Sequence, residues 1–235
     1  MTNKNNAQPI ILIDYDDTLL PTTFLEESGF SIYSPPRADS SISNDLKTLD
    51  DEIVNFFTIC RKYGKPVILT NAEKQWVLKS SEVYLPKTNK ILASLEIHSA
   101  REKYSKKYKN AKEWKKMLLL NELKEVLLDS NFIIGIGDSE YERMAIVHFC
   151  ENNSDDIIGY KNFLLNVDVT NITSSLYFIQ VLNAILPVVI NFKSGSDYTL
   201  GMKTTSLADR KKAQSPRKSQ KGLVRTPYKK ARSIN

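Results

Sequence analysis

The sequence has few glycines, only two cysteines and no long hydrophobic run near its first residue. Eight glycines in 235 residues argue against a loop-rich fold, and no internal repeat of fixed period is present. Cys60 and Cys150 are too few for a disulfide framework and show no zinc-ligand spacing. We therefore expect a chain that folds around an ordinary hydrophobic core in a reducing, intracellular compartment, cytoplasmic or nuclear.

Long apolar segments are also scarce. The run at residues 10–13 is too short for a signal peptide. A longer stretch, residues 176–192, contains Gln180, Asn183 and Pro187 and falls short of the roughly 20 residues that span a bilayer. Its apolar residues recur at helical spacing, which favours a buried amphipathic helix. The sequence therefore predicts neither secretion nor membrane insertion.

Positive charge is concentrated at the end of the chain. Residues 203–235 contain eleven Lys and Arg and a single acid, a net charge of +10. The whole chain carries +6, so residues 1–202 carry −4. The basic segment is open to three interpretations: binding to nucleic acid or another polyanion, an inert extension, or a localisation signal.

Apolar strands alternate with amphipathic helices along the rest of the chain. This alternation predicts an α/β fold of Rossmann-like type, a central parallel sheet with helices on both faces. We expect one domain over residues 10–195, a disordered N-terminus at 1–9 and a disordered basic tail at 196–235. The expected strands are residues 10–14, 66–70, 90–98 and 132–137, with one or two more in 156–169. The expected helices are residues 45–62, 73–84, 111–128, 139–149 and 173–186.

Two carboxylates follow the first strand in the pattern DxDxT, formed by Asp14, Asp16 and Thr18. Side chains alternate along a strand, so Asp14 and Asp16 can point the same way at its end. One carboxylate can then attack while the other holds and delivers a proton. Asp17, in the same segment, is interpreted as a residue that shapes the turn.

Three further groups of polar residues follow in a fixed order. Thr70 ends the second strand and is followed by Asn71, whose backbone N–H and amide are also available. Asp138 follows the strand at 132–137, and Glu142 comes four residues later. A lysine-rich helix precedes that strand, with three candidate lysines, Lys112, Lys115 and Lys116.

These motifs together resemble the haloacid-dehalogenase (HAD) superfamily of phosphohydrolases. The resemblance covers roughly residues 10–145. It implies that Asp14 is a nucleophile that forms an aspartyl-phosphate, that Asp16 is the general acid/base, and that Lys115 is the favoured motif lysine. It also implies that the substrate phosphoryl group contacts Thr18, Thr70 and Asn71. The implied ligands of a Mg²⁺ cofactor are Asp14, the backbone carbonyl of Asp16, Asp138 and Glu142.

Two residues keep a second interpretation. Ser139 and Glu142 have the spacing of a capping box, so Glu142 is a candidate both for a helix cap and for the metal site. Arg101 is a candidate contact for an anionic substrate at the rim of the site.

The segments between the motifs are too short for a large cap domain. The resemblance then favours a phosphatase acting on a large substrate, a phosphoprotein or a nucleic-acid end. The alternative is a catalytically inactive phospho-binding or scaffold module that residues 203–235 tether to nucleic acid.

Overall fold

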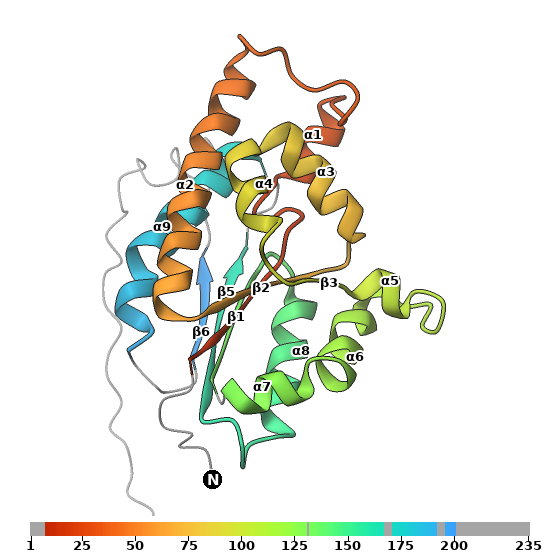
Figure 1. Cartoon of the computed structure of the whole chain (residues 1–235), viewed down its shortest axis with the longest axis vertical. Helices are drawn as coiled ribbons and strands as arrows, with labels where there is room; N and C mark the ends of the chain where they lie inside the picture. Colours follow the sequence, from red (N-terminus) through yellow and green to blue (C-terminus); the bar gives the residue numbers. More distant parts are fainter. Residues whose placement is uncertain (1–7, 131, 167–170, 192–195, 201–235) are drawn as a thin grey trace, which may run out of the picture. The chain divides into compact units, whose positions relative to one another are not determined.

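A computed structural model describes residues 8–130, 132–166, 171–191 and 196–200 (Figure 1). These residues belong to a compact unit that spans Met1–Met202, and the second unit, Lys203–Asn235, lies outside them. The unit is built on a six-stranded sheet in the order β3-β2-β1-β4-β5-β6, in which every pairing is parallel. The strands are β1 Ile10–Ile13, β2 Lys65–Thr70, β3 Ile97–Ser99, β4 Phe132–Gly137, β5 Gly159–Leu165 and β6 Ser196–Leu200.

Helices cover both faces of this sheet, with α2 and α9 side by side on one face and α6, α7 and α8 on the other (Figure 1). The predicted Rossmann-like α/β architecture is therefore confirmed. The helices are α1 Thr22–Glu27, α2 Ser41–Tyr63, α3 Lys74–Tyr84, α4 Pro86–Leu92, α5 Ala100–Tyr104, α6 Trp114–Asn121, α7 Lys124–Ser130, α8 Glu140–Glu151 and α9 Ile172–Val189.

The continuous apolar sequence of β1 follows from its place at the centre of the sheet. Ile11 and Ile13 belong to the core cluster under α2 and α9. Ile10 and Leu12 belong to the opposite cluster, under α6 and α8. All four side chains are at most 4% exposed, because successive strand residues face opposite layers of helices.

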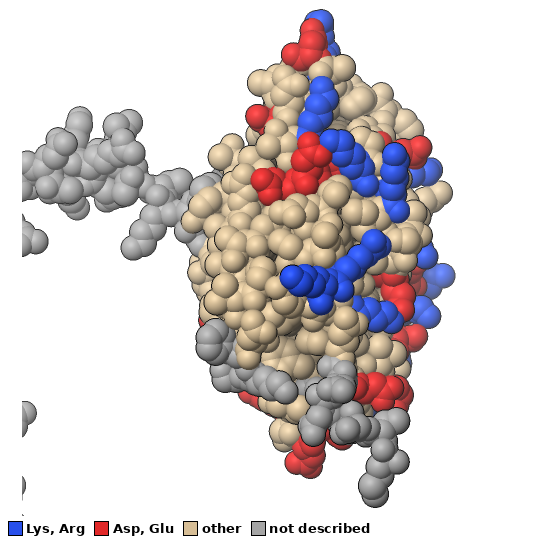
Figure 2. Space-filling view, turned by 60° about the vertical axis from the view of Figure 1, so that its left-hand side comes forward, with Lys and Arg blue, Asp and Glu red and all other residues tan. Residues whose placement is uncertain are grey.

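The apolar helix α9 packs along α2. Phe178, Leu182 and Leu186 are fully buried in the core beneath it, and Asn183 donates a hydrogen bond to the Glu52 carboxylate on α2. By length and composition, α9 is the one helix of the described residues that could cross a membrane, a property that core helices share. In Figure 2, which brings the α2–α9 side of Figure 1 forward, a broad area shows no charged side chain. The expected absence of membrane insertion stays a prediction.

Two of the expected elements differ by more than the position of their ends. Residues 90–92, expected in a strand, end helix α4, and only Ile97–Ser99 pair with the sheet. Pro86 starts that helix, where its missing N–H costs nothing, and Asn89 ties it to α3 by donating to the Leu78 carbonyl. The helix expected at 111–128 is a 3₁₀ turn followed by α6 and α7, with a break between the two helices.

The domain boundary expected at residue 196 is wrong, because residues 196–200 form β6 at the edge of the sheet. Tyr198 stacks on Phe163 of β5 with ring centroids 5.0 Å apart. Asp197 accepts from the Asn162 amide and pairs with Arg143 at 2.8 Å. These contacts anchor a segment that has no apolar periodicity of its own. The expected disorder of residues 1–7 and 201–235 falls outside the described residues.

Candidate active site

Three parallel strands bring the predicted site residues together at the carboxyl ends of the strands, called here the carboxyl edge of the sheet. Asp14 follows β1, Thr70 ends β2 and Asp138 follows β4. The Asp14 backbone N–H donates to the Ile136 carbonyl at 2.9 Å, so the chain stays in register with β4 past the last residue of β1. Carboxyl ends of parallel strands are the usual location of sites in open α/β sheets.

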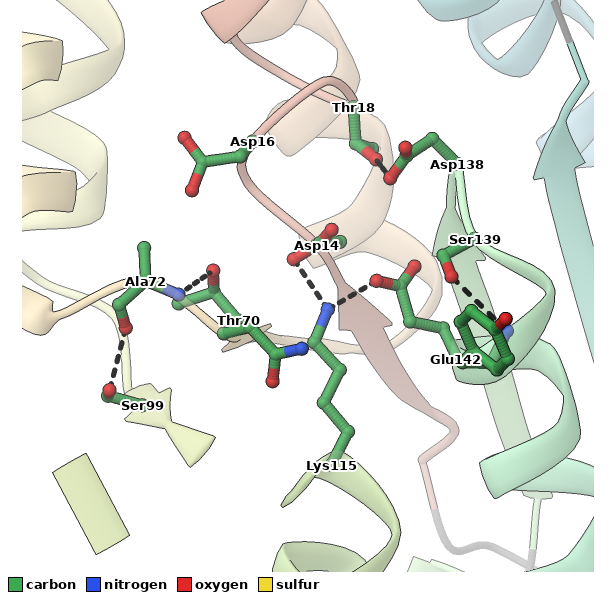
Figure 3. A network of polar contacts seen from close by, with 12 residues as sticks. Asp14, Asp16, Thr18, Thr70, Ala72, Ser99, Lys115, Asp138, Ser139 and Glu142 are labelled. Carbon is green, nitrogen blue, oxygen red and sulfur yellow. Dashed lines mark hydrogen bonds and ion pairs between the residues drawn. The ribbon is translucent and has the colours of Figure 1, made fainter. Parts of the chain in front are cut away.

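A buried lysine joins two of the carboxylates at this edge (Figure 3). Lys115 lies at the start of α6 and is 3% exposed. Its Nζ lies 2.7 Å from Asp14 Oδ1 and 2.5 Å from Glu142 Oε1. Lys112 instead lies over the Tyr141 ring, 4.1 Å from its centroid. Of the three candidate lysines, Lys115 is the one that the structure brings to Asp14.

Glu142 reaches this lysine because of a glycine. A side-chain carbon at Gly137 would collide with the Glu142 carboxylate. The helix cap is made without that carboxylate: Ser139 Oγ accepts from the Tyr141 N–H, and the Glu142 N–H donates to the Ser139 carbonyl. The structure therefore places the Glu142 side chain in the carboxylate cluster and not in a capping box.

Burial and mutual repulsion shift the pKa values in the cluster. Burial opposes the charge on Lys115, but Asp14 and Glu142 outweigh it and raise the lysine pKa, so the ammonium stays charged. Burial, reinforced by Asp14, raises the pKa of Asp138 to about 7. Burial and the Asp14 charge also raise the pKa of Glu142 well above its usual range, although Lys115 opposes this. Asp138 and Glu142 are therefore both harder to ionise in the folded protein than in the unfolded chain.

The cluster fits a divalent metal ion. Carboxylate oxygens of Asp14, Asp138 and Glu142 all lie within 4.8 Å of one another. Glu142 Oε2 is buried and has no hydrogen-bond partner among the described residues. A cation bound among these oxygens would offset the mutual repulsion that opposes ionising Asp138 and Glu142. Oxygen donors of this kind suit a hard cation such as Mg²⁺.

Asp16 lies apart from this cluster and points away from it (Figure 3). Its Oδ1 accepts from Thr22 Oγ1 at 2.6 Å and from Trp76 Nε1 at 3.0 Å. Burial, with a smaller contribution from Asp14, raises the pKa of Asp16. The expectation that Asp14 and Asp16 point the same way is wrong, because β1 ends at Ile13 and strand alternation does not continue through the turn.

The turn after β1 is shaped by its own residues. Asp17 has a φ of 53°, a left-handed conformation that Asp tolerates better than most residues. Its carboxylate accepts from the Thr23 N–H and hydroxyl, as its interpretation as a turn residue requires. Thr18 is fully buried, and its hydroxyl donates to Asp138 Oδ1 at 3.4 Å. Thr18 thus contacts a carboxylate of the cluster. It does not line the pocket at this site, although a contact with the phosphoryl group of the substrate was predicted for it.

The end of β2 carries the remaining predicted residues. Thr70 Oγ1 accepts from the Ala72 N–H at 3.0 Å, which leaves its own proton available to an anion. Asn71 Oδ1 is buried without a hydrogen-bond partner among the described residues. Arg101 Nε donates to the Asn71 carbonyl at 3.0 Å. Arg101, which was expected at the rim of the site, is thereby held next to the end of β2.

These side chains line an open pocket of about 490 Å³, called here the carboxylate pocket. Its basic residues are Lys115 and Arg101, and its hydroxyl and amide groups include Thr70 and Asn71. Its acidic residues are Asp14, Asp16, Asp17, Glu26, Glu73, Asp138 and Glu142. The wall of this pocket thus offers an anion an ammonium, a threonine hydroxyl and a guanidinium.

Three functional residues were missed from the sequence. Thr22 and Trp76 hold Asp16, and Gly137 makes room for Glu142. Gly137 could have been identified from the sequence, because it directly precedes Asp138 at the end of an apolar strand. Thr22 and Trp76 could not have been identified in this way, since their contacts depend on how α1 and α3 fold over the end of β1.

The stability of the metal-free protein should fall as the pH rises. The Asp138 pKa is raised from 3.8 to about 7, so the folded state holds a proton that the unfolded chain has lost. The stability linked to this proton is fully present below pH 3.8 and is lost as the pH rises through about 7. The slope is at most about 1.4 kcal/mol per pH unit for one group.

Urea unfolding in EDTA, from about pH 5 to about pH 8, measures this loss. In Asp138→Asn, which cannot ionise, we expect a shallower fall and a more stable protein at the alkaline end. If the free energy of unfolding falls with pH at the same rate in wild type and in Asp138→Asn, Asp138 does not hold a proton in the folded state.

No protein-family model matches the sequence, and no curated protein matches it. The carboxylate cluster, its buried lysine and the adjoining pocket are therefore the features from which a function can be inferred.

Proposed function

We propose that this chain is a Mg²⁺-dependent phosphomonoester hydrolase of the HAD type, with Asp14 as its nucleophile. The observation that carries the proposal is the Lys115 ammonium, 2.7 Å from Asp14 Oδ1 at the carboxyl edge of a parallel sheet. A buried cation beside the attacking carboxylate stabilises the negative charge of an incoming phosphoryl group. The Thr70 hydroxyl lines the same pocket.

In the first step, an Asp14 oxygen attacks the phosphorus of the ester in line with the leaving oxygen. A P–O bond to Asp14 forms while the P–O bond to the leaving group breaks. Asp16 donates its proton to the leaving oxygen, so the alcohol departs neutral. The raised pKa of Asp16 supports this role, because the residue must carry a proton near neutral pH. Thr22 and Trp76 both donate to Oδ1, and no described residue bonds Oδ2, the oxygen that would bear the proton.

In the second step, water attacks the aspartyl-phosphate and Asp16, now ionised, takes its proton. The P–O bond to Asp14 breaks, and Asp14 returns as a carboxylate with inorganic phosphate as the product. Thr70 and Lys115 hold the phosphoryl oxygens in both steps, and Asn71 adds its backbone N–H. Asp16 ends the cycle protonated, so protons and charges balance.

The metal would be held by Asp14, Asp138 and Glu142, with the Asp16 backbone carbonyl as a further ligand. When bound, Mg²⁺ supplies positive charge against the phosphoryl oxygens. Thr18 keeps Asp138 in place through its hydroxyl. Gly137 does the same for Glu142 by leaving space for its carboxylate.

Asp16 also separates this proposal from its alternatives. In the HAD superfamily a second acid favours a phosphatase or phosphomutase over a dehalogenase or an ion pump, and a mutase needs a site closed against water. An inactive phospho-binding module, tethered to nucleic acid by residues 203–235, has no use for a partly buried, protonatable acid held by two donors. Those residues lie outside the structure, so their partner stays a prediction.

Phosphate release from a generic aryl phosphate tests the proposal, with Mg²⁺ and with EDTA. We expect turnover only with Mg²⁺, and a phosphorylated protein that hydroxylamine cleaves when the reaction is stopped in acid. Folded protein that binds Mg²⁺ but releases no phosphate from any ester would favour the binding module.

A further inference from the structure

A second pocket adjoins the carboxylate pocket on the side of Asp16. It has a volume of about 200 Å³ and shares Thr22, Glu26 and Trp76 with the carboxylate pocket. Its wall is mainly apolar and includes four aromatic rings, so it is called here the ring pocket. Its other lining residues are Leu20, Leu25, Phe30, Ser31, Ile32, Tyr33 and Tyr84.

The two pockets are joined through the residues that hold Asp16. Thr22 and Trp76 both donate to Asp16 Oδ1, and both also line the ring pocket. Lys115 and Glu142 line the carboxylate pocket and not the ring pocket. A phosphoryl group at Asp14 and an organic group in the ring pocket would therefore have Asp16 between them, where a leaving oxygen needs its proton.

We propose that the ring pocket binds the leaving group of the substrate, and that this group is uncharged and aromatic. The inference rests on the proposed phosphatase function and adds the chemical class of the substrate to it. Aromatic groups pack well against aromatic walls, and Trp76 would contact the ring with its face or edge while its N–H stays on Asp16.

Size and charge both support this class of ligand. A dry cavity of about 150 Å³ is known to admit benzene, so about 200 Å³ admits a single substituted ring. Glu26 lies where the pockets meet, and Asp17 and Glu73 line the neighbouring wall. These carboxylates repel a second phosphate, which disfavours the polynucleotide ends considered from the sequence.

Two alkyl phosphates separate binding in the ring pocket from leaving-group chemistry. Ethyl phosphate and 2-phenylethyl phosphate both release primary alcohols and differ mainly by one ring. With Mg²⁺ and the full chain, we expect kcat/KM to be about tenfold or more higher for 2-phenylethyl phosphate. A 3′-phosphorylated oligonucleotide should be a poorer substrate than 2-phenylethyl phosphate.

Substitutions in the wall of the ring pocket test whether this pocket causes the preference for 2-phenylethyl phosphate. Phe30→Ser and Tyr33→Ser should each lower the ratio of the two kcat/KM values severalfold. Tyr33 is 89% exposed, so its variant is expected to fold even if Phe30→Ser does not. Tyr177→Ser is the matched control, since Tyr177 is 44% exposed on α9 and lines neither pocket. It should leave the ratio unchanged.

The possible results distinguish the two proposals. Phosphate release from both esters with equal kcat/KM overturns the ring-pocket inference and leaves the phosphatase intact. The same conclusion follows if the preference survives both wall variants, or if the oligonucleotide is the best substrate. Release from no ester overturns the phosphatase and the inference together.

Discussion

Asp14→Asn should abolish phosphate release, with kcat lowered by roughly 10⁴-fold or more. The amide is nearly isosteric with the carboxylate but is a poor nucleophile, so no aspartyl-phosphate should form. The measurement is steady-state phosphate release from an aryl phosphate with Mg²⁺, together with acid-quench trapping of the phosphorylated protein. Both signals should disappear in the variant.

The matched control is Asp129→Asn. Asp129 is exposed on α7, before β4 begins, at the opposite edge of the sheet from the carboxylate pocket. It should retain wild-type kcat and wild-type phosphorylation. Phosphate release that survives Asp14→Asn, with the variant folded, would mean that another residue is the nucleophile.

Lys115→Met should reduce both activity and stability. Lys115 is 3% exposed and contacts two carboxylates, so its removal leaves Asp14 and Glu142 buried without their cation. Loss of one partner from a buried ion pair costs about 3–5 kcal/mol. We expect a loss of that size in the metal-free protein at neutral pH, and a fall in kcat of about 10³-fold with Mg²⁺.

The stability loss should depend on pH in a diagnostic way. Burial and Asp14 already raise the Glu142 pKa, so without Lys115 the Glu142 carboxylate should take up a proton more readily. Urea unfolding should therefore show a smaller loss for Lys115→Met at about pH 5 than at about pH 8. A loss of equal size at both pH values would indicate that the lysine contributes packing and not charge.

Lys116→Met is the control for this variant. Lys116 is the next residue of α6, is only partly buried and lines neither the carboxylate pocket nor the ring pocket. Its variant should keep wild-type activity and stability. If Lys116→Met and not Lys115→Met lost activity, the motif lysine would be misassigned.

The order of elements and the central motif residues could be predicted from the sequence. Buried parallel strands are continuous apolar runs, and a polar residue at the end of such a run must lie at the sheet edge. Asp14, Thr70 and Asp138 each end or follow such a run. Their convergence therefore required no knowledge of long-range contacts beyond the parallel sheet itself.

Local patterns were least informative where long-range contacts decide the structure. Ser196–Leu200 carries no strand periodicity that separates it from the basic tail, yet it pairs with β5. Ile91 and Leu92 were predicted to lie in a strand, yet they are the last two residues of α4. In both cases packing against residues far away in the sequence outweighed local preference.

The sequence by itself determined the α/β architecture, the edge of the sheet that carries the carboxylates and the short list of candidate lysines. Tertiary structure decided that Lys115 pairs with Asp14, that Glu142 joins the cluster instead of capping α8, and that Asp16 turns toward Thr22 and Trp76. The physical reason is that strand and helix periodicities act over a few residues. The direction of a charged side chain past a strand end is set by whichever distant partners can offset the cost of its burial.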